Sequence, residues 1–280
     1  MSQTPPVVLT IAGFDPSSGA GVTADIKTIA AHGCYGLACI TALTVQSTQG
    51  VNRVDAVPPQ LIADTLENLA ADFDISTLHV GMLANAAAAQ TVVEFQNRRK
   101  LPLVLDPVLR ASSGATLLDD AGRRVLLHEL MPLATVTTPN VDEASVMTQL
   151  PVTNPLEMKA AATKLHEMGA AAVVITGGHL QPAVDLLSFQ SNGKYDQEEF
   201  RSDHQSSRST HGTGCAFSTA LACNLALGKT LAEAVMLAKA YVTVAIAHGQ
   251  ALGRGNGPVN HLYRLDEGNL EKAKSRPKTA

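Results

Sequence analysis

The regular alternation of short apolar segments with longer helical patterns is the feature that most constrains the fold of this chain. The apolar segments are continuous runs at residues 7–14, 35–44, 77–83, 101–108, 133–140 and 171–176. Apolar residues at helical spacing mark the segments 21–33, 58–73, from Asn85, near 119–130, 141–149 and 155–168. Continuous apolar strands are typical of parallel sheets buried on both faces. The alternation therefore predicts an α/β fold with a doubly wound, mostly parallel sheet and helices on both faces.

The remaining third of the chain adds a hairpin and two helices to this pattern. The hairpin is expected within 182–204 and turns at Asn192-Gly193, and the helices are expected at 214–228 and 230–247. No Pro/Ser/Gly-rich stretch or charge run divides the sequence. We therefore expect a single domain over 1–280, with a polar tail from about residue 266.

Composition excludes several classes of partner. The net charge is −4, and the 21 Lys and Arg residues are scattered, which argues against a nucleic-acid or membrane-surface partner. The N-terminal apolar run is too short for a signal peptide and lacks a basic flank, so we expect a cytoplasmic protein. The four cysteines have neither CxxC spacing nor histidines at metal-ligand intervals, which argues against a disulfide scaffold or a zinc site.

The sequence HGTGC at 211–215 is the first candidate for chemistry. Gly212 and Gly214 would let the backbone approach a ligand, and the following helix would present free N–H groups to an anion. Cys215 in the first turn of that helix would have a lowered pKa and could act as a base or nucleophile. An inert buried cysteine beside a tight turn is the alternative. His211, next to the turn, is the histidine that we single out.

Other unusual motifs also follow expected strands, where doubly wound folds bind ligands. The loop in AGFDPSSGAGVTADIKT lacks both GxGxxG and GK[ST], so it is no Walker A loop. Asp25, inside the helix that follows the loop, suits a polar ring substrate, although a solvated surface carboxylate is the alternative. In TPNVDEA, Asn140 and Glu143 fit a helix capping box, or Glu143 could orient water around a magnesium–nucleotide complex. Asp106 in LDPV, at a strand end, again suggests magnesium.

These motifs form an ordered set that resembles a known family. The set is AGFDPSSGAGVTADIKT, ITALTVQSTQGV, GML, LDPV with a following SG, TPNVDEA, GGHL, HGTGCAFSTALA and GPVNH. In this order they resemble the hydroxymethylpyrimidine/phosphomethylpyrimidine kinases of thiamine biosynthesis, from about Val7 to His261. The resemblance implies a ribokinase-like fold, use of ATP and Mg²⁺, and phosphorylation of an aminopyrimidine alcohol and then of its monophosphate. It also allows for a homodimer.

The resemblance assigns roles to individual residues. Those lining the pyrimidine pocket would be Gly13, Asp25, Gln46, Met82 and Val108. Gly212, Thr213 and Gly214 would form the anion hole, with Cys215 facing the substrate hydroxyl as the base. Asn140, Glu143, Thr176 and Lys239 would lie near the ATP phosphates, and Asp106 and Glu143 near Mg²⁺, Glu143 through water.

The chain departs from the family pattern at four positions. Ser112 and Thr176 stand where lysine is common, Phe14 where a small hydroxyl residue is usual, and Thr23 where glutamine is usual. Two alternatives stay open: a vitamin B6 (pyridoxal/pyridoxine) kinase with the same fold, and a homologue that binds a pyrimidine or nucleotide without catalysis.

Overall fold

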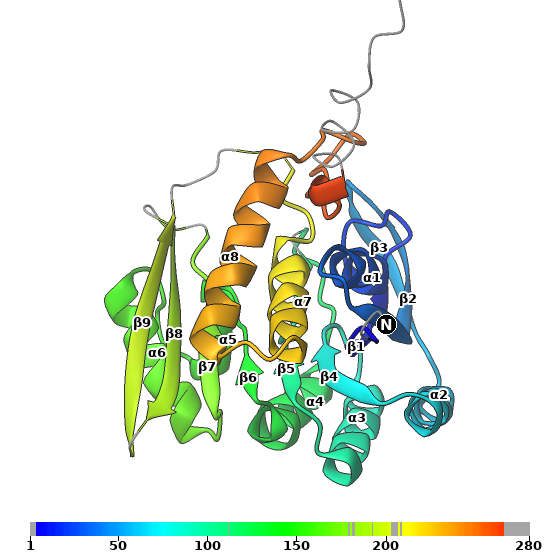
Figure 1. Cartoon of the computed structure of the whole chain (residues 1–280), viewed down its shortest axis with the longest axis horizontal. Helices are drawn as coiled ribbons and strands as arrows, with labels where there is room; N and C mark the ends of the chain where they lie inside the picture. The colour runs from blue at the N-terminus through cyan, green and yellow to red at the C-terminus, as the bar shows by residue number, and fades with distance from the viewer. Residues whose placement is uncertain are drawn as a thin grey trace, which may run out of the picture.

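A computed structural model of the chain describes residues 4–111, 113–178, 180, 183–191, 193–202, 207 and 209–265. One nine-stranded sheet runs through these residues in the order β3-β2-β1-β4-β5-β6-β7-β8-β9 (Figure 1). The strands are β1 Val7–Phe14, β2 Tyr35–Ser47, β3 Gly50–Ala56, β4 Ile75–Val80, β5 Leu103–Leu105, β6 Val136–Thr137, β7 Ala172–Ile175, β8 Ala183–Ser191 and β9 Lys194–Ser202. Ser112, His179, Asn192 and the predicted polar tail lie outside the described residues.

Helices connect the strands in the predicted alternation. They are α1 Gly21–Ala31, α2 Pro59–Asp72, α3 Ala86–Arg99, α4 Asp120–Val125, α5 Val141–Thr148, α6 Pro155–Glu167, α7 Thr213–Ala226 and α8 Leu231–Ala247. The predicted helix near 119–130 continues past α4 as a π-helical turn, Leu126–Leu130, and a 3-10 turn, Met131–Leu133. Among the described helices, none combines the length and apolarity that a membrane span requires.

The centre of the sheet is parallel, as predicted, and its edges are antiparallel. Strands β2, β1, β4, β5, β6 and β7 pair in parallel. Strand β3 pairs antiparallel with β2 on one edge, and β8 and β9 form the predicted antiparallel hairpin on the other. The sequence did not predict β3, because the segment VNRVDA is mostly exposed and carries no apolar run. Strand β2 is also longer than predicted and carries Gln46 within it.

Alternate side chains of the central strands enter two different cores. In β5, Leu103 and Leu105 join the core that packs against α2, α3, α5 and α6. Val104 between them joins the second core, which packs against α1, α7 and α8. Figure 1 shows α7 and α8 lying together across the sheet face that is nearer the viewer. The sheet is therefore covered by helices on both faces, as the continuous apolar strands predicted.

Candidate active site

The turn that starts α7 is fixed by a close approach to the loop after β1. Gly212 is the N-cap residue with a φ of 82°, and a Cβ there would lie 1.8 Å from the Gly19 carbonyl oxygen. Only glycine is compatible with that contact and that dihedral angle. A Cβ on Gly214 would meet nothing within 4 Å. Gly212 therefore joins two loops of the protein, whereas Gly214 leaves open space in front of the helix.

The start of α7 has the geometry of an anion hole. The N-cap provides no side-chain hydrogen bond, and Thr213 N–H donates to Thr210 O at 3.3 Å. Within the described ranges, the N–H groups of Gly214 and Cys215 have no hydrogen-bond acceptor. Free N–H groups and the partial positive charge of a helix N-terminus favour a bound anion.

Cys215 is partly buried in the first turn of α7, and the backbone N–H of Gly21 at the start of α1 acts to lower its thiol pKa. The expectation of a lowered thiol pKa is wrong. Burial and the negative charges of three carboxyl groups, Asp106, Asp25 and Glu143, raise the pKa of Cys215 well above its ordinary value. Two helix N-termini do not offset those charges, so the thiol is neutral here at pH 7.

The expected ring pocket begins with a contact between Gly13 and Met82. A Cβ on Gly13 would lie 2.7 Å from the Met82 sulfur, so the absence of a side chain lets Met82 cover the end of β1. Met82 and Val108 belong to one small apolar cluster with Leu117. The structure therefore brings Gly13, Met82 and Val108 together, as their assigned role requires.

Gln46, the polar member of the expected ring pocket, lies beside His211. Its Nε2 is 3.3 Å from His211 Nε2, which in turn lies 2.9 Å from Asp15 Oδ2. Asp15 also accepts hydrogen bonds from Ser17, Gly19 and Ala20 N–H groups. Burial raises the pKa of Asp15, but the bonds from His211 and Ser17 outweigh it and leave that pKa lowered. Sequence reasoning missed Asp15, although an aspartate before a Pro-Ser-Ser turn is a signal for a side chain that organises its own loop.

Asp25, which is assigned to the ring pocket, is held by partners within the protein, and its role as a substrate contact stays a prediction. The side chain is fully buried, because this position of α1 faces the sheet. Thr10 Oγ1 donates to Asp25 Oδ2 at 2.6 Å, and Thr219 Oγ1 donates to Oδ1 at 2.8 Å. Both carboxylate oxygens are thus occupied by protein hydroxyls.

Asn140 and Glu143 form the capping box that their spacing predicted. Asn140 Oδ1 accepts from Glu143 N–H and Glu143 Oε2 accepts from Asn140 N–H, both at 2.9 Å. Burial, together with the nearby Asp106 charge, raises the pKa of Glu143 to about 8. Burial also raises the pKa of Asp106 to about 6. The two carboxyl groups therefore resist being ionised together in the absence of a cation.

This carboxyl pair fits a magnesium ion better than a protein-caged metal. Among the described residues, no three His, Cys, Asp or Glu side chains gather as a metal site. Mg²⁺ in phosphate sites takes one or two carboxylates and completes its shell with water and phosphate oxygens. Two buried carboxyl groups with raised pKa values are a donor set whose charge such an ion would neutralise.

Thr176 and Lys239, the two remaining residues assigned to phosphate binding, are bonded to other parts of the protein. Thr176 N–H donates to Pro139 O at 2.9 Å, and its own carbonyl accepts from Val141 N–H at 3.2 Å, which ties the end of β7 to the start of α5. Lys239 pairs with Asp185, at 2.9 Å between Nζ and Oδ2. The charge of the lysine is therefore engaged by a protein carboxylate.

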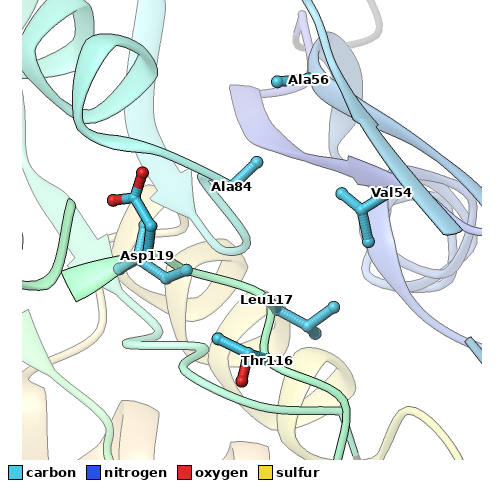
Figure 2. A pocket seen from close by; sticks show the side chains of 7 residues that line it. Val54, Ala56, Ala84, Thr116, Leu117 and Asp119 are labelled. Carbon is cyan, nitrogen blue, oxygen red and sulfur yellow. The ribbon is translucent and has the colours of Figure 1, made fainter. Parts of the chain in front are cut away.

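A hollow of about 230 Å³ lies beside the Met82 cluster (Figure 2). It is lined by Val54, Ala56, Ala84, Thr116, Leu117, Leu118 and Asp119. None of the residues assigned to substrate or phosphate contributes to its wall. Leu117, which also packs with Met82 and Val108, connects its wall to the Met82 cluster.

The parallel sheet and a helix start that is open to anions at its carboxyl edge define an α/β phosphotransferase with a ribokinase-like fold. The sequence profile described as phosphomethylpyrimidine kinase matches residues 15–260, and the chain belongs to this family.

Individual relatives agree with this placement. The chain is 41% identical over 266 residues to the thiamine biosynthesis bifunctional protein of Geobacter sulfurreducens, covering 93% of this chain but only 53% of that longer protein. It is 38% identical to the hydroxymethylpyrimidine/phosphomethylpyrimidine kinase of Streptomyces coelicolor, covering 94% and 97% of the two chains. The crystal structure of Bacillus subtilis pyridoxal kinase with ADP superposes with a TM-score of 0.83 at 32% identity, covering 93% of this chain and 99% of that one.

Proposed function

We propose that this protein is an ATP-dependent kinase of thiamine biosynthesis. It phosphorylates the hydroxymethyl group of 4-amino-5-hydroxymethyl-2-methylpyrimidine and, more slowly, the resulting monophosphate. The observation that carries the proposal is the placement of Cys215 and the free N–H groups of α7 at the carboxyl edge of the sheet, which also holds Gly13 and Met82. We infer a cytoplasmic homodimer that binds small molecules and ATP rather than nucleic acid or membrane.

Ring recognition is assigned to Gln46 between apolar walls. A side-chain amide offers a donor pair and an acceptor, which match the ring nitrogen and exocyclic amine of an aminopyrimidine. His211 and Thr44 contact the amide of Gln46 and limit its rotation. Gly13, Met82 and Val108 supply the apolar surfaces against which the ring would stack.

Phosphoryl transfer in this site depends on position and charge. The turn Gly212, Thr213 and Gly214 holds the transferring phosphate through the free N–H groups of Gly214 and Cys215, and the Cys215 sulfur takes the proton of the substrate hydroxyl. Asn140, Thr176 and Lys239 lie along the assigned path of the other phosphates. Asp106 would hold Mg²⁺ and Glu143 would hold its water; bound there, the ion would neutralise phosphate charge.

The discriminating experiment measures ADP formation from ATP and Mg²⁺ with and without the hydroxymethylpyrimidine, for the wild type and for Cys215→Ala. The proposal expects pyrimidine-dependent ADP formation that the substitution removes. Pyrimidine binding without ADP formation by the wild type would instead support the non-catalytic homologue.

A vitamin B6 kinase is the second candidate, and one observation favours it. The pyridoxal kinase of Bacillus subtilis shares the fold over nearly its whole length. The chain is nevertheless less similar in sequence to that enzyme, at 32%, than to the Streptomyces coelicolor kinase, at 38%. Comparing kcat/KM for the hydroxymethylpyrimidine and for pyridoxal separates the two functions.

A further inference from the structure

A buried polar chain runs beneath the start of α7 and centres on His79 of β4. His79, Asp25, Thr10 and Ser218 are each fully buried, and Asp106 is nearly so. His79 Nε2 lies 2.9 Å from Ser218 Oγ, and Ser218 Oγ lies 3.1 Å from Asp106 Oδ2. On the other side of the ring, Nδ1 lies 3.1 Å from Thr10 Oγ1 and 3.5 Å from Asp25 Oδ2.

The hydrogen-bond donors around the His79 ring indicate that its Nδ1 carries a proton. Each hydroxyl has one proton to give. Thr10 gives its proton to Asp25 Oδ2 at 2.6 Å, and Thr219 gives its proton to Asp25 Oδ1 at 2.8 Å. Neither hydroxyl can then donate to the ring, so Nδ1 of His79 has to be the donor towards Thr10 and Asp25.

The same accounting places a second proton on Nε2. Ser218 Oγ faces Asp106 Oδ2 and also the carbonyl oxygens of Gly214, at 3.1 Å, and Cys215, at 3.2 Å. If Ser218 donated to His79 instead, the nearly buried Asp106 would lose its hydroxyl donor, which is costly in a core. With Ser218 donating to Asp106, Nε2 has to donate to Ser218.

Charge balance leads to the same assignment. Asp25 and Asp106 are the carboxylates that act on the ring, Asp25 directly and Asp106 through Ser218. Two buried carboxylates without a cation are strongly unfavourable. Burial lowers the pKa of His79, but the charges of Asp25 and Asp106 outweigh it and leave that pKa raised.

We propose that His79 is a positioning residue. Its ring is a doubly protonated imidazolium that lies between Asp25 on one side and the Ser218–Asp106 pair on the other. This cation holds the first turn of α7 in place, and with it Cys215 and the anion hole. Ser218 transmits the contact, because it belongs to α7 itself and lies directly after the first turn of that helix. The cation also offsets carboxylate charge beneath a site that must admit phosphates.

The direct test is the protonation of His79 in the full-length protein, read from nitrogen-15 NMR of histidine-labelled protein. The His79→Gln variant assigns the signal by its loss. The proposal expects protons on both ring nitrogens at neutral and mildly alkaline pH. A His79 signal with one unprotonated ring nitrogen at neutral pH overturns it, whether or not the protein proves to be a kinase.

The kinetic test rests on the proposed function. His79→Gln keeps hydrogen-bonding capacity but removes the charge, and misplacement of the first turn should lower kcat by about 10- to 100-fold with little change in KM. His79→Lys restores a buried cation and should recover part of that kcat. Thr219→Val removes one hydroxyl but no charge and is the matched control. It should lower kcat less than His79→Gln does. Wild-type kcat in His79→Gln, or equal losses in the Gln and Lys variants, contradicts the role of the charge.

Discussion

Lys239 Nζ lies 2.9 Å from Asp185 Oδ2, and Gly177 N–H donates to the other oxygen of the same carboxylate at 3.0 Å. Both side chains of the pair are largely buried. Lys239 therefore neutralises a protein carboxylate and supports the loop directly after Thr176. Because Asp185 already neutralises it, Lys239 offers little net positive charge to an incoming phosphate. Thr176, in the same region, is uncharged.

The second phosphorylation should consequently be slower than the first. A monophosphate acceptor brings about two negative charges towards the γ-phosphate of ATP, and close like charges cost several kcal/mol unless cations offset them. We predict that the monophosphate accumulates during turnover, as measured by chromatography of the products. Diphosphate that forms without detectable monophosphate would refute the charge argument.

Adding a cation near the phosphates should speed the second step selectively. Thr176→Lys, and Ser112→Lys, should raise the rate of diphosphate formation more than the rate of monophosphate formation. Thr163→Lys adds the same charge on the exposed surface of α6 and serves as the control. An equal effect of all three substitutions would attribute the change to net charge alone.

Removing the thiol should remove most of the turnover. Cys215→Ala should lower kcat by about 10²–10⁴-fold, the range for a lost general base, with little change in substrate affinity. At alkaline pH, where its thiolate forms, Cys215 should also be alkylated faster than Cys34, Cys39 and Cys223, because those three are buried and Cys215 is partly exposed. Bound substrate should slow the alkylation. Undiminished turnover in the Ala variant would exclude Cys215 from the chemistry.

The raised thiol pKa gives the reaction a defined pH dependence. A base works only when deprotonated, so a pKa above the ordinary value means that kcat should rise as the pH rises through the alkaline range. Cys215→Asp places a base of lower pKa at the same position and should move the rising limb to lower pH. Ionisation of Glu143, whose pKa is about 8, also raises activity with pH but is common to both proteins. If kcat of Cys215→Asp rises over the same pH range as kcat of the wild type, the pH dependence is due to Glu143 and not to Cys215.

Gln46 should control affinity for the ring without affecting the nucleotide. Gln46→Ala should weaken pyrimidine binding by ~1–3 kcal/mol, because it leaves ring polar groups unpaired. His211→Ala should act in the same direction but less strongly, since His211 contacts the amide of Gln46 and not its assigned ligand. Calorimetric titration with pyrimidine and with ATP separates the effects. Equal losses for both ligands would indicate damage to the fold.

The parallel centre of the sheet was predictable because its strands are buried on both faces and therefore read as continuous apolar runs. Strand β3 was not predictable, since an exposed edge strand such as VNRVDA is held by backbone pairing with β2 rather than by buried side chains. The capping box of Asn140 and Glu143 was predictable from a spacing of three residues, because both partners lie in one helical turn.

The electrostatics of the site could not be inferred from local spacing. Asp25 meets Thr219 across 194 positions of the sequence, and Lys239 meets Asp185 across 54. The raised pKa of Cys215 likewise depends on Asp106 and Asp25, which come from other elements. Sequence motifs predicted that Asp106 and Cys215 lie at one edge of the sheet, but only the packed structure determines which charges pair.

The central claim is tested most directly by the products formed from ATP, Mg²⁺ and 4-amino-5-hydroxymethyl-2-methylpyrimidine, with pyridoxal as the competing acceptor in the same reaction. The account predicts pyrimidine monophosphate as the first and main product, with kcat/KM well above that for pyridoxal. Preferential formation of pyridoxal phosphate, or no phosphorylated pyrimidine at all, would contradict it.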